Sequence, residues 1–232
     1  KKAGLDPNTP PKNWDELYEY ANRLTIPETG QYGIGFPKGG PGAWHFMNLL
    51  WQAGGDAIAQ DDKGEWRSVF NSDAGVQAVN FFQKLAIGKW QNGKGKNVEG
   101  VMLRDQKVDE AFRVGKTAMI FSYISKIVLF PIKYDPEVVG IATLPVGPSG
   151  RIVNEINASM LGINATSSKQ RRDAAWDYIK YMYSDEVEKT ITKAYVVNGY
   201  GKFVNPRMLK KFNYDDIVDE VPKGWINIAS VA

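Results

Sequence analysis

The sequence contains no cysteine and a single histidine among its 232 residues. Without cysteine the chain can form no disulfide, no thiolate metal site and no cysteine nucleophile. One histidine excludes a zinc site built on two histidines of the same chain, and a Ser-His-Asp triad would need His45 as its base. No run of about 18 apolar residues is present, so no segment is predicted to span a membrane. We therefore expect neither a metal ion nor a cofactor.

The charged residues are nearly balanced, with 29 Lys and Arg against 26 Asp and Glu and a net charge of +3. Nucleic-acid-binding domains usually carry a clustered basic surface, so we expect no nucleic-acid partner. The chain opens on Lys1-Lys2-Ala3-Gly4, which lacks the charged-then-apolar order of a signal segment. It ends at Ala232 without residues that mark the end of a structural element, and we expect a trimmed piece of a longer protein.

Hydrophobic periodicity predicts helices and strands that alternate with short connections, which is typical of the α/β class. Helices are expected near residues 14–24, 43–53, 72–87, 105–114 and 170–183, and strands near residues 32–36, 117–121, 138–143 and 152–163. A hairpin or loop is expected over residues 56–71, and residues 92–100 are expected to contribute nothing to the core. Apolar stripes are expected on two helices, with Val76, Val79, Phe82 and Leu85 on one and Ala174, Ala175, Tyr178, Ile179 and Met182 on the other.

No catalytic motif is present: the sequence has no GxSxG elbow, phosphate-binding loop or dinucleotide fingerprint. Asp105, Asp109 and Glu110 share one predicted helix, where such spacing is typical of a solvated polar face. His45 lies on an apolar helix and is interpreted as a structural histidine. We therefore predict that the chain is not an enzyme.

Aromatic residues are abundant, with 7 Trp, 11 Tyr and 10 Phe. Most fit helix stripes and are expected in the core, but Trp44, Tyr123 and Trp225 lie at element edges beside glycines or polar loops. Ligands of α/β folds bind at such edges, and flat rings stack on sugar rings. These three side chains are therefore candidate ligand contacts.

Polar residues also interrupt the otherwise apolar segment 152–163, where Asn154, Glu155, Asn157 and Ser159 occur together. Buried polar groups need hydrogen-bond partners, which either a neighbouring loop or a hydroxyl-rich ligand would supply. A solvated crossover between two lobes is the alternative interpretation. Glu155, Asn157 and Ser159 are the candidate polar ligand contacts.

Short motifs follow one another in a fixed order over about residues 3–205. They are Ala3-Gly4-Leu5-Asp6, Pro10-Pro11-Lys12-Asn13-Trp14-Asp15-Glu16-Leu17, Gly30-Gln31-Tyr32-Gly33, Phe70-Asn71-Ser72 with Gly75-Val76, Ala111-Phe112-Arg113-Val114-Gly115-Lys116-Thr117-Ala118-Met119, Leu144-Pro145-Val146-Gly147-Pro148-Ser149-Gly150, and Ala174-Ala175-Trp176-Asp177-Tyr178-Ile179-Lys180-Tyr181-Met182 before Ser184-Asp185-Glu186. In this order the sequence resembles the extracellular solute-binding proteins of ABC importers, specifically the sugar-binding group that includes maltose-binding protein.

The resemblance implies a periplasmic-binding-protein-like (type II) α/β fold, in which a ligand is clamped between two hinged lobes. Residues 1–153 would form the second lobe, and residues 154–205 would form the hinge crossover and the returning strand and helices of the first lobe. Residues 206–232 would be a short, truncated helical tail. The returning region would lack its usual partner strands.

The resemblance also implies site residues and a function. Trp44 falls where relatives place a sugar-stacking aromatic residue, and Tyr123 falls in a segment where relatives often carry a binding tryptophan. Asn157 to Ser159 replaces the usual Gly-Gly-Trp, which suggests a different ligand or a polar contact.

The function implied is solute binding for an ABC importer, with a carbohydrate as ligand and a membrane permease as partner. The protein would be monomeric and extracytoplasmic, either periplasmic or a cell-surface lipoprotein. Two alternatives stay open at this point. One is a glycan-active hydrolase that uses Glu155 with a second carboxylate, and the other is a ligand-sensing ectodomain.

Overall fold

The computed structural model describes residues 3–123, 139–155 and 160–221. The chain divides into two compact units, which are described one at a time. Unit 1 comprises residues 1–134 and 144–155, and unit 2 comprises residues 135–143 and 156–232.

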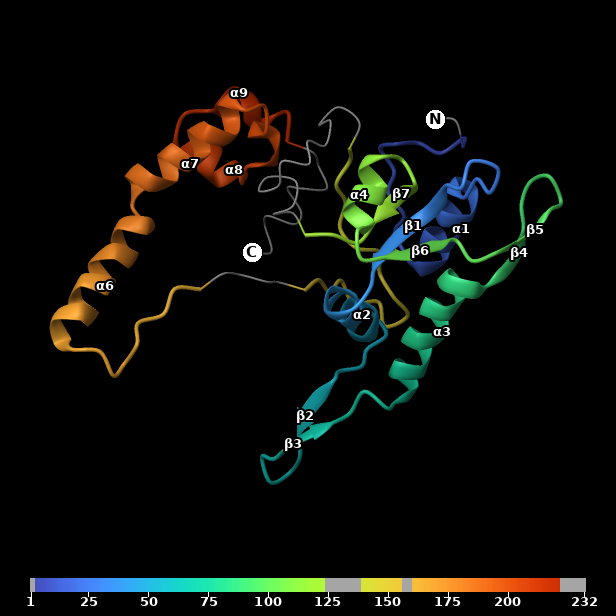
Figure 1. Cartoon of the computed structure of the whole chain (residues 1–232), viewed down its shortest axis with the longest axis horizontal. Helices are drawn as coiled ribbons and strands as arrows, with labels where there is room; N and C mark the ends of the chain where they lie inside the picture. The colour runs from blue at the N-terminus through green and yellow to red at the C-terminus, as the bar shows by residue number, and fades with distance from the viewer. Residues whose placement is uncertain (1–2, 124–138, 156–159, 222–232) are drawn as a thin grey trace. The chain divides into compact units, whose positions relative to one another are not determined.

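Unit 1 is built on a parallel sheet in which β1 (Tyr32–Pro37) lies between β6 (Met102–Asp105) and β7 (Thr117–Ile120) (Figure 1). Ile34 of β1 pairs with Met102 on one side and with Met119 on the other. Five of the six residues of β1 are buried, as expected for a strand of a parallel sheet covered on both faces. The predicted α/β class is therefore confirmed.

Four helices pack around this sheet: α1 (Trp14–Leu24), α2 (Gly40–Gln52), α3 (Asp73–Ile87) and α4 (Val108–Arg113). Phe36 of β1 contacts His45 of α2 and Phe82 of α3, with ring centroids 6.1 Å and 5.0 Å apart. A Cβ atom added to the neighbouring Gly35 would meet Val108 of α4 at 2.5 Å. Successive residues of a strand point to opposite faces, so α2 and α3 lie on one face and α4 on the other.

The start of α1 follows from its capping residues. The Asn13 side chain accepts the Glu16 N–H at 2.9 Å, and the Glu16 carboxylate accepts the Lys12 N–H at 2.8 Å. The sequence predicted a capping box, in which the Glu16 carboxylate would accept the N–H of the capping residue Asn13. The carboxylate instead accepts the N–H of Lys12, one residue earlier. The indole of Trp14 then stacks on Phe81 of α3, with ring centroids 4.3 Å apart, and joins α1 to the core.

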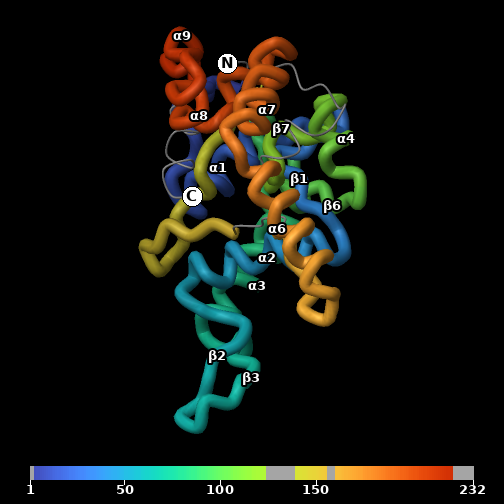
Figure 2. Tube along the Cα trace, turned by 90° about the vertical axis from the view of Figure 1, so that its left-hand side faces the viewer, coloured from blue at the N-terminus to red at the C-terminus, as the bar shows by residue number. Residues whose placement is uncertain are grey.

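Two antiparallel hairpins extend unit 1. The first consists of β2 (Ile58–Gln60) and β3 (Trp66–Ser68), as expected for residues 56–71, and both views show it directed away from the sheet (Figures 1 and 2). The second consists of β4 (Lys89–Gln91) and β5 (Asn97–Glu99). Within residues 92–100, Asn97–Glu99 form β5, and the Gly100 carbonyl accepts the Trp90 indole N–H at 3.2 Å.

Unit 2 contains α6 (Lys169–Met182), α7 (Asp185–Val197), the short 3-10 helix η1 (Gly201–Phe203), α8 (Pro206–Lys211) and α9 (Asp215–Val218). Phe203, Leu209 and Val221 are buried in it. The Lys211 ammonium donates to Asp185 at 2.8 Å and to Glu188 at 2.6 Å, which links α8 to α7. These bonds raise the pKa of Lys211 above its ordinary value.

The predicted stripe on α3 is confirmed at Leu85, which is buried, and Phe82 packs partly buried against the core, but the stripe is wrong at Val76 and Val79. The buried residues are Gly75, Ala78, Phe81 and Leu85, whereas Val76 and Val79 are 55% and 44% exposed. The stacking of Phe81 on Trp14 accounts for this rotation, because it places the smaller residues of the same stripe against the core.

The inward stripe predicted on α6 is also wrong, because α6 buries none of its residues and Tyr178 is 58% exposed. Two strand predictions fail over the described residues: 139–143, 152–155 and 160–163 form no strand. A strand requires a neighbour that satisfies its backbone, and apolar patterning does not supply one. Residues 138 and 156–159 of these predictions lie outside the described residues.

Candidate functional site

Trp44 is the fifth residue of α2, the helix that follows the carboxyl end of β1. The approach is close, since a Cβ atom added to Gly42 would meet the Pro37 carbonyl oxygen at 2.3 Å. Gly39 precedes the helix with a φ of 71°, which glycine adopts readily. The Trp44 side chain is 57% exposed, whereas His45 beside it is 5% exposed. Helix α2 therefore presents an indole to solvent at the sheet edge where α/β folds bind ligands.

Tyr123 follows the end of β7 and lies against α2. Its ring packs on His45 with centroids 4.7 Å apart and an interplanar angle of 32°. Its hydroxyl donates to the two Glu155 oxygens at 3.3 Å and 3.4 Å. Burial, and then the neighbouring Glu155 carboxylate, raise the pKa of Tyr123. Two residues that the sequence indicated separately thus form one pair, and His45 is buried, as expected for a structural histidine.

Glu155 is held by α2 through its backbone. Its N–H donates to the Asn48 side-chain oxygen at 2.6 Å, and the Asn48 amide donates to the His45 carbonyl at 3.4 Å. Asn48 is only 2% exposed. We call His45, Asn48, Tyr123 and Glu155 the α2 cluster.

Gln52 anchors the segment that leads to Glu155. Its backbone carbonyl accepts the Ser149 N–H at 3.1 Å and the Ser149 hydroxyl at 2.7 Å. Its side-chain amide donates to the Val153 carbonyl at 3.4 Å. The Gln52 side-chain oxygen in turn accepts the Trp14 indole N–H at 2.8 Å. Sequence reasoning missed Asn48 and Gln52. The signal was present, since His45, Asn48 and Gln52 recur at helical spacing inside an apolar helix.

The α2 cluster and Trp44 have the chemistry needed to bind a hydroxyl-rich ligand. The Glu155 carboxylate accepts hydrogen bonds, the Tyr123 hydroxyl donates or accepts, and the Trp44 indole offers a flat apolar face. The described contacts of the Glu155 carboxylate are with a phenol and include no second carboxylate.

Three predicted contacts, Asn157, Ser159 and Trp225, lie outside the described residues. The placement of these side chains therefore stays a prediction.

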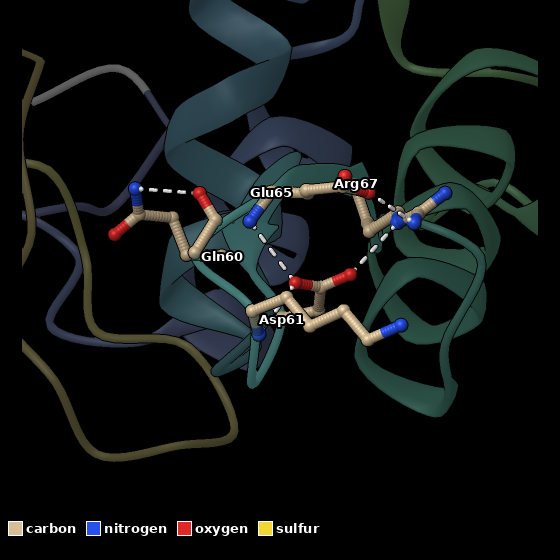
Figure 3. Close-up of polar contacts among 6 residues, drawn as sticks. Gln60, Asp61, Glu65 and Arg67 are labelled. Carbon is tan, nitrogen blue, oxygen red and sulfur yellow. Dashed lines mark hydrogen bonds and ion pairs between the residues drawn. The ribbon is translucent and has the colours of Figure 1, made fainter.

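The acidic tip of the β2–β3 hairpin has a structural explanation. Figure 3 shows the Asp61 carboxylate between the Glu65 backbone N–H, at 3.0 Å, and the Arg67 guanidinium, at 3.0 Å. These bonds lower the pKa of Asp61, and the partners of its carboxylate all lie within the hairpin itself. Over the described ranges, no group of three or more acidic or histidine side chains is arranged to hold a metal ion. In the same ranges, no helix combines the length and apolar character needed to cross a membrane.

Solved structures share this fold. A solute-binding protein of an ABC transporter from Agrobacterium radiobacter K84, in complex with ribitol, is 24% identical, with a TM-score of 0.64 over 96% of this chain and 54% of that one. Maltose-bound MalE3 of T. maritima is 23% identical, with a TM-score of 0.64 over 97% of this chain and 56% of that one.

A third solved structure is the cyclic alpha-maltosyl-1,6-maltose binding protein of Arthrobacter globiformis. It is 20% identical, with a TM-score of 0.61 over 98% of this chain and 54% of that one. The chain thus spans about half the length of the structures it matches. No curated protein sequence adds a match to these.

The family comparison covers most of the sequence. Residues 1–189 match the model of the bacterial extracellular solute-binding proteins. That range contains the sheet of unit 1, helices α1 to α4 and the whole α2 cluster. The resemblance stated from the ordered motifs is confirmed, and the chain belongs to the family of bacterial extracellular solute-binding proteins.

Proposed function

We propose that this chain is part of the substrate-binding component of an ABC importer and binds a sugar or oligosaccharide. The observation that carries the proposal is the hydrogen-bonded pair of Tyr123 and Glu155, which is attached to α2 through His45 and Asn48, together with the exposed indole of Trp44 on the same helix. Family membership supports solute binding. The ribitol, maltose and cyclic maltosyl-maltose ligands of the similar structures support a carbohydrate.

Binding in this proposal needs no covalent step. The Trp44 indole stacks on the apolar face of a sugar ring, while Glu155 and Tyr123 exchange hydrogen bonds with water for bonds with sugar hydroxyls. Asn48 holds the Glu155 backbone in place before the ligand arrives, so little ordering is required on binding. Asn157, Ser159 and Trp225 are proposed as further contacts.

The wider assignment follows from the family and is part of the same proposal. Unit 1 supplies most of one lobe, the ligand is enclosed by closure on a second lobe, and a membrane permease receives it. The protein acts as a monomer outside the cytoplasm, in the periplasm or as a cell-surface lipoprotein.

Calorimetric titration tests the proposal, with the chain expressed together with whatever sequence flanks it in its gene. The panel contains ribitol, glucose, maltose, maltotriose and xylo-oligosaccharides, with a tripeptide and Ca²⁺ as ligands of other classes. We expect saturable heat with at least one sugar. Glu155→Gln and Trp44→Ala each weaken that binding about 10- to 100-fold, because each removes a charge-assisted hydrogen bond or a stacking surface.

Trp66→Ala is the matched control for Trp44→Ala, because Trp66 is 65% exposed on the β2–β3 hairpin. Its affinity should equal that of the unmodified protein. Absence of heat with every sugar, together with tight binding of the peptide or the cation, would contradict the carbohydrate assignment.

A further inference from the structure

Two asparagines of the chain are followed directly by glycine, Asn92 before Gly93 and Asn198 before Gly199. In this dipeptide the backbone nitrogen of the glycine can attack the side-chain carbonyl carbon of the asparagine, because glycine has no Cβ atom to obstruct the approach. The attack expels ammonia, so the amide is converted without an enzyme. The two sites share this local sequence, and they differ in the hydrogen bonds that the fold gives them.

Asn92 lies directly after β4, at the start of the turn of the β4–β5 hairpin. Its side-chain oxygen accepts the backbone N–H of Lys94 and the backbone N–H of Lys96, each at 3.0 Å. Both donors polarise the Asn92 side-chain carbonyl, and they face the oxygen on which negative charge develops when the carbon is attacked. The turn therefore stabilises the charge that this reaction creates.

The attacking and leaving groups at this turn have few bonds to break. Within the described part of the chain, neither the Gly93 N–H nor the Asn92 side-chain nitrogen donates a hydrogen bond. Gly93 is exposed, and a Cβ atom added to it would have no neighbour within 4 Å. The strands of this hairpin are only three residues long, and the tip of such a short hairpin opens readily. Gly93 can therefore rotate toward the Asn92 side chain at little cost.

Asn198 has the opposite arrangement, at the C-terminal cap of α7. Its side-chain nitrogen donates to the Ala194 carbonyl at 2.7 Å, and the Gly199 N–H donates to the Val196 carbonyl at 3.0 Å. An attack at Asn198 must break both of these bonds. The cap of α7 therefore protects Asn198, although this residue is exposed.

We propose that Asn92 is a site of spontaneous deamidation in the folded protein, whereas Asn198 is protected. The Gly93 nitrogen loses its proton to water or hydroxide and bonds to Asn92 Cγ, and the Cγ–Nδ2 bond breaks to release ammonia. Water then opens the cyclic succinimide at either carbonyl, which gives aspartate or isoaspartate. Nothing is oxidised or reduced, and water is the only co-reactant. This modification does not depend on which ligand the protein binds.

The two products change the hairpin differently. Aspartate keeps the length of the backbone and places a carboxylate where the Lys94 and Lys96 N–H groups already donate, and such charge-assisted bonds are stronger. Isoaspartate adds a methylene to the backbone next to the bond from the Asn92 N–H to the Lys96 carbonyl, at 3.0 Å. We therefore expect isoaspartate to loosen the turn and to speed trypsin cleavage after Lys94 and Lys96.

Peptide mapping by mass spectrometry tests this site, with labelling by isoaspartyl methyltransferase to identify the isoaspartyl product. The protein carrying its flanking sequence is incubated at neutral and at mildly alkaline pH, both folded and in concentrated urea. In the folded protein we expect Asn92 to react at least about tenfold faster than Asn198. The rate should rise with pH, because the Gly93 nitrogen must lose its proton. In urea the two sites should react at similar rates, because the fold no longer distinguishes them.

Gly93→Ala is the variant that tests the attacking nitrogen, and its new methyl group has room in the folded protein. It should slow the reaction at Asn92 by about tenfold or more and leave Asn198 unchanged. Gly40→Ala, where a Cβ atom also has no neighbour within 4 Å, is the matched control and should leave both rates unchanged. Equal rates at Asn92 and Asn198 in the folded protein would overturn the proposal. A slower reaction of Asn92 in the folded protein than in urea would also overturn it, because the bonds to its side-chain oxygen would then protect the amide.

Discussion

The buried side-chain oxygen of Asn48 accepts the backbone N–H of Glu155 at 2.6 Å. One residue of α2 therefore fixes the backbone of Glu155, whose carboxylate is proposed to bind the ligand. The other end of the same amide donates to the His45 carbonyl one turn earlier. Asn48 thus uses both ends of its side chain to position the site.

Asn48→Ala should destabilise unit 1 by about 1–3 kcal/mol, because the Glu155 N–H loses its acceptor in a half-buried position. Urea denaturation measures the effect. Asn97→Ala on β5 is the matched control, since Asn97 is exposed, and it should change stability by less than about 0.5 kcal/mol. Equal stability of the two variants would show that the Asn48 bond does not anchor Glu155.

Gln52→Leu keeps a side chain of similar size but removes the acceptor of the Trp14 indole N–H and the donor to the Val153 carbonyl. We expect a loss of about 1–3 kcal/mol and weaker sugar binding, because residues 149–155 lose a point of attachment to α2. Thermal unfolding and the sugar titration measure the two effects. The exposed Gln60→Leu on β2 is the control, and an identical result for both variants would rule out the anchoring role.

The pH dependence of stability should report on Tyr123. Its pKa is raised in the folded protein from the ordinary value of 10.0, so the unfolded chain loses the phenolic proton first as the pH rises. The stabilisation is fully present below about pH 10 and decreases as the pH rises toward the folded pKa. Tyr123→Phe should lose less stability over this range than the unmodified protein. Because the chain has 11 tyrosines, the control is Tyr178→Phe, whose side chain is 58% exposed. A steeper loss in Tyr123→Phe would contradict this sign.

Gly33→Ala should destabilise the sheet of unit 1 by about 3 kcal/mol or more, since the new Cβ would lie 1.9 Å from the Ala21 carbonyl oxygen of α1. Gly40→Ala is the control, because a Cβ atom at Gly40 has no neighbour within 4 Å. Its stability should be unchanged or higher by up to about 1 kcal/mol. Circular dichroism during urea unfolding compares the two variants. Similar stabilities would contradict the close packing of α1 on β1.

Local signals predicted much of unit 1. The Asn13 cap fixed the start of α1, and the short apolar runs around Ile34 and Met119 predicted the strands that pair in parallel. Tyr123 and Glu155 were each indicated by position, yet they lie 32 residues apart, and only the fold brings them together. Asn48 and Gln52 were missed because the apolar character of α2 outweighed its polar positions.

Side-chain periodicity does not specify which residues pack against a helix. On α3, both faces carry apolar residues, and the stacking of Phe81 on Trp14 decides which face is buried. On α6, Trp176 and Tyr178 were expected in the core but are 54% and 58% exposed. The pattern predicted the helix correctly, but burial depends on neighbours that local sequence does not encode.

The most direct test of the central claim is a crystal structure of the protein with the sugar that binds most tightly in the titrations. We predict a sugar ring in contact with the Trp44 indole, with a hydroxyl donating to the Glu155 carboxylate at about 2.5–3.0 Å and Tyr123 still packed on His45. A sugar bound with no contact to Trp44, Tyr123 or Glu155 would contradict the account.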